Sequence, residues 1–349
     1  MNSELSQGDR VLRAFILGAG ASVHVGYPLI KDLGPKLMKY VAENPGPRNY
    51  PYWLDPDELK KYGPLDDIEE IVTALEQSER PGPILAFLRE AVCAFFNSIR
   101  ANSALLYRHF ASEVVRDGDV VITFNYDVSL DRELRKTGKW EISDGYGFDL
   151  GIPGMGRSAT RLLKLHGSTN WMDSVFDGLQ GNKSQQGDGN SLGARPVILP
   201  QEFEFLEYHN IRDPRFKGGG MARSGSMILP GRRKRFYVST SINPHEREEF
   251  WTRLWTEAEE ALKQANEIVV VGYSFAPADE NARSLVFDTS NRNVLLTICC
   301  GQDTHRVARE FVQCGFSDVR SDFKRFEDWL AAQCLQDAGG AGAAFRVSA

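Results

Sequence analysis

Short apolar runs recur along the chain, each followed by glycine or by polar residues. Three have the length of a buried strand: VLRAFIL at Val11 to Leu17, DVVITF at Asp119 to Phe124, and LLKL at Leu162 to Leu165. Two more, EIVVV at 267–271 and NVLLTICC at 293–300, follow towards the C-terminus. Strands that alternate with helical stretches are typical of a parallel sheet covered by helices. The pattern therefore predicts an α/β fold with a Rossmann-like parallel sheet flanked by helices.

The periodicity changes between the first two strands. From 29 to 112 apolar residues recur three and four apart, as in LDDIEEIVTALEQ, and prolines divide the stretch into separate helices. We expect a helical layer here, inserted into an α/β core made of 1–28 and 113–335. Residues 177–195 are polar and rich in glycine, which predicts a mobile loop. The low-complexity residues 336–349 predict a disordered tail.

The composition is that of an ordinary soluble protein, with 42% hydrophobic and 25% charged residues. The formal net charge of −6 gives no global field that favours nucleic acid or an anionic membrane. No apolar run approaches the ~20 residues of a membrane span, and the first residues lack an apolar signal segment, so we expect a cytoplasmic protein. The five cysteines include no CxxC pair, which argues against a disulfide framework and against a zinc ribbon. We therefore expect no metal site.

A glycine-rich turn, GAGAS, begins where the first strand ends. Gly18 and Gly20 would let the backbone approach a pyrophosphate, and the helix that follows would present N–H groups and its positive dipole end to that anion. The dinucleotide fingerprint GxGxxG is not complete, because Val23 occupies the third glycine position. A tight turn that binds nothing is the alternative interpretation.

Polar side chains also follow the second and third strands. Asn125 and Asp127 stand at the carboxyl end of the second strand, where open α/β sheets bind their ligands. An amide and a carboxylate there could hold a carboxamide and a water or ribose hydroxyl; alternatively, they cap the next helix. His166 follows the third strand and could act as a general base near neutral pH, or could be a structural group. His24, just beyond GAGAS, is the other candidate for this base.

The segment VVVGYSFAPADENARSL ends a later strand in the same manner. Gly272 and Ser274 would be placed to contact a ribose or phosphate. Asp279 and Asn281 could cap the next helix or reach the ligand. Four motifs with glycine, amide, imidazole and serine groups thus fall at strand ends in one chain, which favours a nucleotide site over four unrelated turns.

Taken in order, GAGAS, TFNYD, LKLHGS, MILPGRRKRFY and VVVGYSFAPAD resemble motifs of the sirtuin superfamily. The resemblance is to a divergent bacterial branch whose members act as NAD-cleaving effectors in anti-phage defence. It spans residues 16–279 and implies a sirtuin-like NAD-binding domain over residues 1–335, with NAD as substrate. The residues that it implies for binding NAD are, for the diphosphate, Gly18, Ala19, Gly20 and Ser22; for the adenosine side, Gly272 and Ser274; and, near the adenine, Cys300 and Gly301.

The resemblance also implies catalytic roles. Asn125 would position water or the ribose, Asp127 would hold the nicotinamide ribose or carboxamide, and His166 would be the base. Two departures set the chain apart from protein-deacylating sirtuins. It lacks the four cysteines of their zinc ribbon, and GYPLIKD stands where they carry a proline–aspartate–phenylalanine–arginine run. Both departures favour water, rather than an acyl group, as the nucleophile.

The expected function is therefore that of an NAD glycohydrolase, which cleaves NAD to ADP-ribose and nicotinamide as a regulated effector of anti-phage defence. Because uncontrolled NAD loss is toxic, we expect a homo-oligomer, a regulatory partner protein, or both, and no direct binding of nucleic acid. The helical layer or the loop at 177–195 could gate the site. Two alternatives remain open: a zinc-free NAD-dependent protein deacylase, and a non-catalytic module that senses NAD or ADP-ribose.

Overall fold

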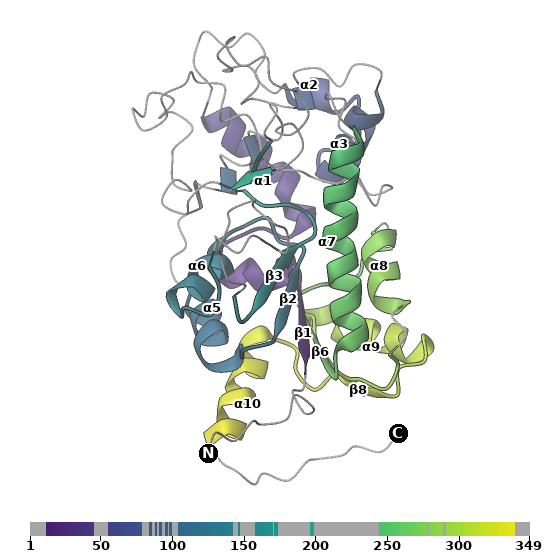
Figure 1. Ribbon diagram of the computed structural model, residues 1–349. Coiled ribbons are helices and arrows are strands. Elements are labelled where there is room, and N and C mark those ends of the chain that lie inside the picture. The colour runs from purple at the N-terminus through teal and green to yellow at the C-terminus, as the bar shows by residue number, and fades with distance from the viewer. Residues whose placement is uncertain are drawn as a thin grey trace, which may run out of the picture.

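The computed structural model shows a central sheet with helices on both faces (Figure 1). The structure describes residues 12–44, 55–78, 104–141, 146, 158–169, 171–173, 196–198, 244–277, 279–288 and 291–338, and between them positions 84, 85, 88, 91, 92, 95, 96, 98 and 99. The loop expected at 177–195 and the motif MILPGRRKRFY lie outside the described residues.

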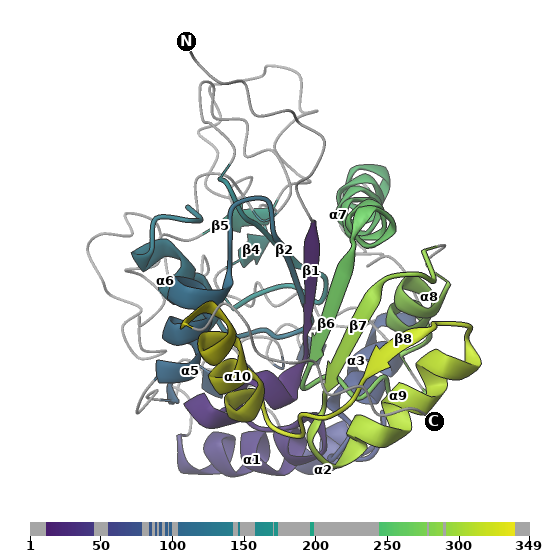
Figure 2. The ribbon, with the colours of Figure 1, turned by 90° about the horizontal axis from the view of Figure 1, so that it is seen from below.

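The main sheet has six strands in the order β3-β2-β1-β6-β7-β8, and every neighbouring pair is parallel. Figure 2 shows β1 inside the sheet between β2 and β6, with β8 at one edge. A separate antiparallel pair is formed by two short strands, β4 and β5. The strand bounds are β1 (Arg13–Leu17), β2 (Val120–Thr123), β3 (Arg161–Lys164), β4 (Trp171–Asp173), β5 (Pro196–Ile198), β6 (Glu267–Val271), β7 (Leu295–Cys299) and β8 (Asp318–Arg320).

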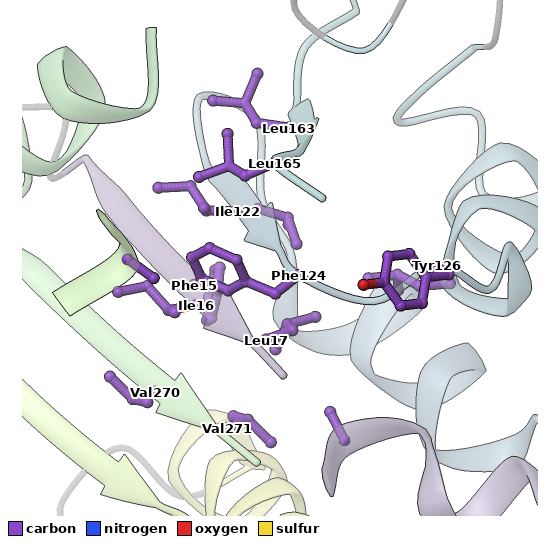
Figure 3. Packing of buried hydrophobic residues seen from close by; sticks show 14 of the residues in the cluster. Phe15, Ile16, Leu17, Ile122, Phe124, Tyr126, Leu163, Leu165, Val270 and Val271 are labelled. Atoms are coloured by element: carbon purple, nitrogen blue, oxygen red, sulfur yellow. The ribbon is translucent and has the colours of Figure 1, made fainter. Parts of the chain in front are cut away.

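The inner strands are mostly apolar because both faces of the sheet are covered. Every residue of β1 and β2 is buried, and so are the last four residues of β6. Figure 3 shows side chains of β1, β2, β3 and β6 packed together in one core, with Tyr126 in the loop beyond β2. A continuous apolar run of five or six residues therefore marked a strand buried on two sides.

Helices cover both faces of this sheet. In Figure 1, α7, α8 and α9 lie on one side of it, and α5, α6 and α10 lie on the other. The helix bounds are α1 (Ile30–Glu43), α2 (Pro56–Leu59), α3 (Ile68–Gln77), α5 (Leu105–His109), α6 (Ser129–Lys136), α7 (Pro244–Gln264), α8 (Glu280–Phe287), α9 (Thr304–Gln313) and α10 (Phe326–Ala338), with 3₁₀ turns η1 (Ala19–Val25) and η6 (Gly301–Asp303) and the π-helical turn η2 (Phe110–Val114).

The predicted fold class is confirmed: a Rossmann-like parallel sheet flanked by helices. Between β1 and β2 the described residues are helical, with α1, α2, α3, α5 and η2 in the stretch where we expected an inserted layer. At the other end of the chain, α10 runs to Ala338, and residues 339–349 lie outside the described residues. Each helix in the described part of the chain is too short or too polar to span a bilayer.

The register brings several strand ends to one edge of the sheet. Leu17 of β1 pairs with Thr123 of β2 and with Val271 of β6, and Thr123 pairs with Lys164 of β3. The ladder continues one residue further, since the amide of Leu165 donates to the carbonyl of Thr123 at 3.0 Å. The segments that follow β1, β2, β3 and β6 therefore begin side by side at the carboxyl edge.

Candidate active site

Three of the predicted site residues form one buried hydrogen-bond network at this edge. The Ser22 hydroxyl donates to Asp127 Oδ2 at 2.6 Å, and Asn125 Nδ2 donates to Ser22 Oγ at 3.0 Å. Asn125 Nδ2 also donates to the carbonyl oxygen of Gly18 at 2.9 Å. These bonds fix the rotamer of the Asn125 amide and tie the loop after β2 to the loop after β1.

Tyr107, from α5 of the helical layer, completes this network. Its hydroxyl lies 2.7 Å from Ser22 Oγ. Burial raises the pKa of Tyr107 well above its usual value, and the negative charge of Asp127 acts in the same direction, so the phenol stays protonated. No motif in the sequence pointed to this role. A tyrosine on the apolar face of an amphipathic helix is normally interpreted as a core residue. In addition, the contact between Tyr107 and Ser22 joins positions 85 residues apart.

Asp127 serves the backbone as well as Ser22. Its Oδ1 accepts from the amide of Ser129 at 3.0 Å, so Asp127 forms an Asp turn directly before α6, although α6 has no side-chain cap at Val128. The carbonyl oxygen of Asp127 accepts from Lys164 Nζ at 2.6 Å. Lys164 is fully buried and also lies 3.4 Å from the carboxylate of Asp131. Burial raises the pKa of Asp131, and the charge of Lys164 opposes that rise.

We expect Lys164→Met to lower the free energy of unfolding by about 3–5 kcal/mol, because removing one partner of a buried ion pair leaves the other charge uncompensated. Urea denaturation followed by circular dichroism measures the change. Lys263→Met is the matched control, since Lys263 only pairs with Glu259 on the exposed face of α7 and its loss should leave stability near that of the wild type. Equal stability of the two variants would contradict a structural role for Lys164.

His166 follows β3 at the position that corresponds to that of Asn125 after β2. Each lies two residues beyond the registered pair Thr123–Lys164. The ring of His166 is mostly buried; its centroid lies 4.9 Å from that of Phe124 and 6.4 Å from that of Tyr126. His166 therefore packs against the two residues that flank Asn125 in the chain.

His24, the other candidate for the general base, lies in η1. Its Nδ1 is 2.8 Å from the carbonyl oxygen of Ala21, and its ring contacts that of Tyr107 edge-on at 4.8 Å. Burial lowers the pKa of His24, which favours the neutral imidazole. His24 thus borders the network beside Ser22, on the side of the helical layer.

The glycines of GAGAS pack against the loop after β6. A Cβ at Gly18 would come within 2.6 Å of Tyr273, and one at Gly20 within 2.7 Å of the Gly272 backbone. Gly272 itself has φ +64, and a Cβ there would meet the amide of Ala21 at 2.2 Å. The amide of Gly18 donates to the carbonyl oxygen of Val271 at the end of β6 and that of Gly20 to Gly272, so these two N–H groups are not free for a diphosphate. Close backbone packing therefore explains these glycines on its own.

The remaining predicted binding residues follow β6 and β7. The carbonyl oxygen of Ser274 accepts from Arg306 at 2.6 Å. The Cys300 thiol donates to the carbonyl oxygen of Tyr273 at 3.2 Å, and burial raises the pKa of Cys300 to about 12, so the thiol stays neutral. Gly301 is exposed, with φ +63. Among the described residues, no group of three or more His, Cys, Asp or Glu is arranged to hold a metal ion.

Solved structures offer a point of comparison for this arrangement. A structure concerned with the mechanism and regulation of Sir2 enzymes is 16% identical, with a TM-score of 0.44 over 93% of this chain and 91% of that one. The chain is similar to Sir2 enzymes. A Sir2 complex with a p53 peptide and NAD⁺ gives 13% identity and a TM-score of 0.36, over 94% of this chain and 93% of that one. A third structure is a Sir2 complex with the inhibitor EX-527, 2′-O-acetyl-ADP-ribose and a deacetylated p53 peptide. It is 13% identical, with a TM-score of 0.37 over 94% of each chain.

These likenesses are distant, with identities of 16% or less and TM-scores below 0.5. No family model matches the chain, and no curated protein matches it in sequence.

Proposed function

We propose that this chain binds NAD at the carboxyl edge of β1, β2, β3 and β6 and hydrolyses the bond between nicotinamide and ribose. One observation carries the proposal. Asn125 and His166 occupy equivalent positions, two residues beyond the ends of neighbouring strands, and the Asn125 amide is held by Gly18 and Ser22 of the glycine-rich turn. An amide, a carboxylate and an imidazole at one edge supply partners for a carboxamide, ribose hydroxyls and a water molecule.

The reaction needs a stabilised cation and a positioned water. When the glycosidic bond breaks, its electron pair goes to the nicotinamide nitrogen, which becomes neutral, and the ribose becomes oxocarbenium-like. Water then bonds to the anomeric carbon. Its proton passes to His166, directly or through a ribose hydroxyl, and then to solvent. The products are ADP-ribose, nicotinamide and a proton.

In this mechanism the fixed amide of Asn125 orients the water or the ribose, so that less orientational freedom is lost at the moment of reaction. Asp127, tied to Ser22 and to the turn before α6, holds the nicotinamide ribose or carboxamide. The turn Gly18 to Ser22 would line the diphosphate, and Gly272, Ser274, Cys300 and Gly301 the adenosine side. In the cell such an enzyme would act as a regulated effector that depletes NAD in anti-phage defence, as an oligomer or with a regulatory partner.

The nucleophile separates this function from a deacylase. We expect the purified protein to release nicotinamide from NAD at the same rate with and without an acyl-lysine peptide, because water needs no co-substrate. Chromatography of nicotinamide measures both rates. Release only with the peptide would overturn hydrolysis in favour of acyl transfer. Intact NAD that nonetheless raises the melting temperature would overturn catalysis in favour of a sensing module.

A further inference from the structure

His166 has a carboxylate beside it that comes from a different part of the fold. Its Nε2 lies 3.8 Å from Asp279 Oδ2, and both side chains are largely buried, with 11% and 17% of their surfaces exposed. Among the described residues beside this ring, Phe124 and the phenol Tyr126 pack against it, and Asp279 carries the charged side chain. At such low exposure, solvent screens the interaction less than it would at the surface.

Asp279 is itself firmly held. Its Oδ2 accepts a short hydrogen bond from the hydroxyl of Tyr273, and its Oδ1 accepts from the amide of Ala282 at 3.3 Å as the N-cap of α8. The loop before it is fixed by Phe275, which has φ +51 and a fully buried ring. Arg283 donates to the carbonyl oxygen of Phe275 at 2.8 Å. The carboxylate therefore sits on a rigid support.

We propose that Asp279 is a positioning residue for the reaction, which orients the His166 ring and stabilises the imidazolium that forms when His166 takes a proton. The inference rests on the proposed hydrolysis. A base whose ring is oriented by a third group is the arrangement that nucleophile activation requires, because the orienting carboxylate selects the tautomer that can accept the proton. A carboxylate on the Nε2 side favours the Nε2–H tautomer, which leaves Nδ1 as the nitrogen that would take the proton from the water or ribose hydroxyl.

This role has to be separated from helix capping, since Asp279 does both. Asn caps a helix as well as Asp does but carries no charge, so Asp279→Asn keeps the N-cap of α8 and removes the carboxylate. Asp67→Asn is the matched control, because Asp67 is the side-chain N-cap of α3. Asp279→Ala also loses the cap, so the difference in melting temperature between it and Asp279→Asn shows how much the cap of α8 contributes.

The test uses two readouts on the full chain. We expect kcat for NAD hydrolysis by Asp279→Asn to fall at least ~10-fold, part of the roughly 10²–10⁴-fold that a positioned base supplies, with KM for NAD unchanged. In ¹⁵N NMR spectra of the neutral ring, His166 should be mainly the Nε2–H tautomer in the wild type, and that preference should weaken in Asp279→Asn, because the carboxylate 3.8 Å from Nε2 has been removed. Asp67→Asn should change neither.

The tautomer does not depend on turnover, so the two proposals fail separately. An unchanged tautomer of His166 in a folded Asp279→Asn protein would overturn the positioning role. A kcat within twofold of the wild type in an active enzyme would do the same. A wild type that leaves NAD intact, while the tautomer still changes in Asp279→Asn, would overturn the hydrolysis and leave the pairing of His166 with Asp279 standing.

Discussion

Asn125→Ala is expected to lower the rate of NAD hydrolysis by at least ~100-fold, since a group that holds water or the ribose in line contributes through orientation. Both hydrogens of the Asn125 amide are used on Gly18 and Ser22, so the side chain is fixed before substrate arrives. Nicotinamide release, followed by chromatography at saturating NAD, measures the effect.

The same change has a cost in stability that must be measured beside it. Removing the amide takes one hydrogen bond from Ser22 Oγ and one from the carbonyl of Gly18, at about 0.5–1.5 kcal/mol each, while both atoms keep other partners. Asn125→Asp keeps the shape but cannot donate, and it adds a charge beside Asp127, so it should be as inactive as Asn125→Ala. Asn293→Ala, at an exposed position, is the control. Near-wild-type turnover by both Asn125 variants would refute the role.

His166→Ala is expected to lower turnover by at least ~100-fold as well, because it removes the general base. NAD binding should survive, since in the proposed site the ring accepts a proton rather than anchoring the substrate. NAD should therefore still raise the melting temperature of this variant.

The control for His166→Ala is His305→Ala, on the exposed side of α9, which should keep full activity. If His166→Ala hydrolyses NAD at close to the wild-type rate, the base lies elsewhere, and His24 beside Ser22 becomes the residue to replace. If NAD no longer raises the melting temperature of His166→Ala, the ring binds substrate and the division between binding and catalysis is wrong.

The sequence predicted most of the sheet because β1, β2, β6 and β7 are apolar runs buried on both faces. β8 was missed. Its three residues, Asp318–Arg320, carry no apolar run, since the strand lies at the edge of the sheet and is partly exposed. Strand ends in a parallel sheet must meet at one edge, so the placement of Asn125 near His166 could also be predicted.

The contacts made by these residues could not be predicted in the same way. Ser22 was assigned to a diphosphate, but its hydroxyl is bonded to Asp127 and lies beside Tyr107, which comes from the helical layer. These contacts join positions 85 and 105 residues apart, and only the packing of α5 against the sheet edge brings them together. For Asp279, capping and contact with a ligand looked like alternatives in the sequence; its Oδ1 caps α8, and its proximity to His166 was not foreseen.

The central claim is that this chain hydrolyses NAD at the edge shared by Asn125 and His166. Mass spectrometry of NAD incubated with purified protein, without peptide, tests it most directly when wild type and His166→Ala are prepared identically. We expect equimolar nicotinamide and ADP-ribose from the wild type and almost none of either product from His166→Ala. Intact NAD with the wild type, or equal cleavage by both proteins, would contradict it.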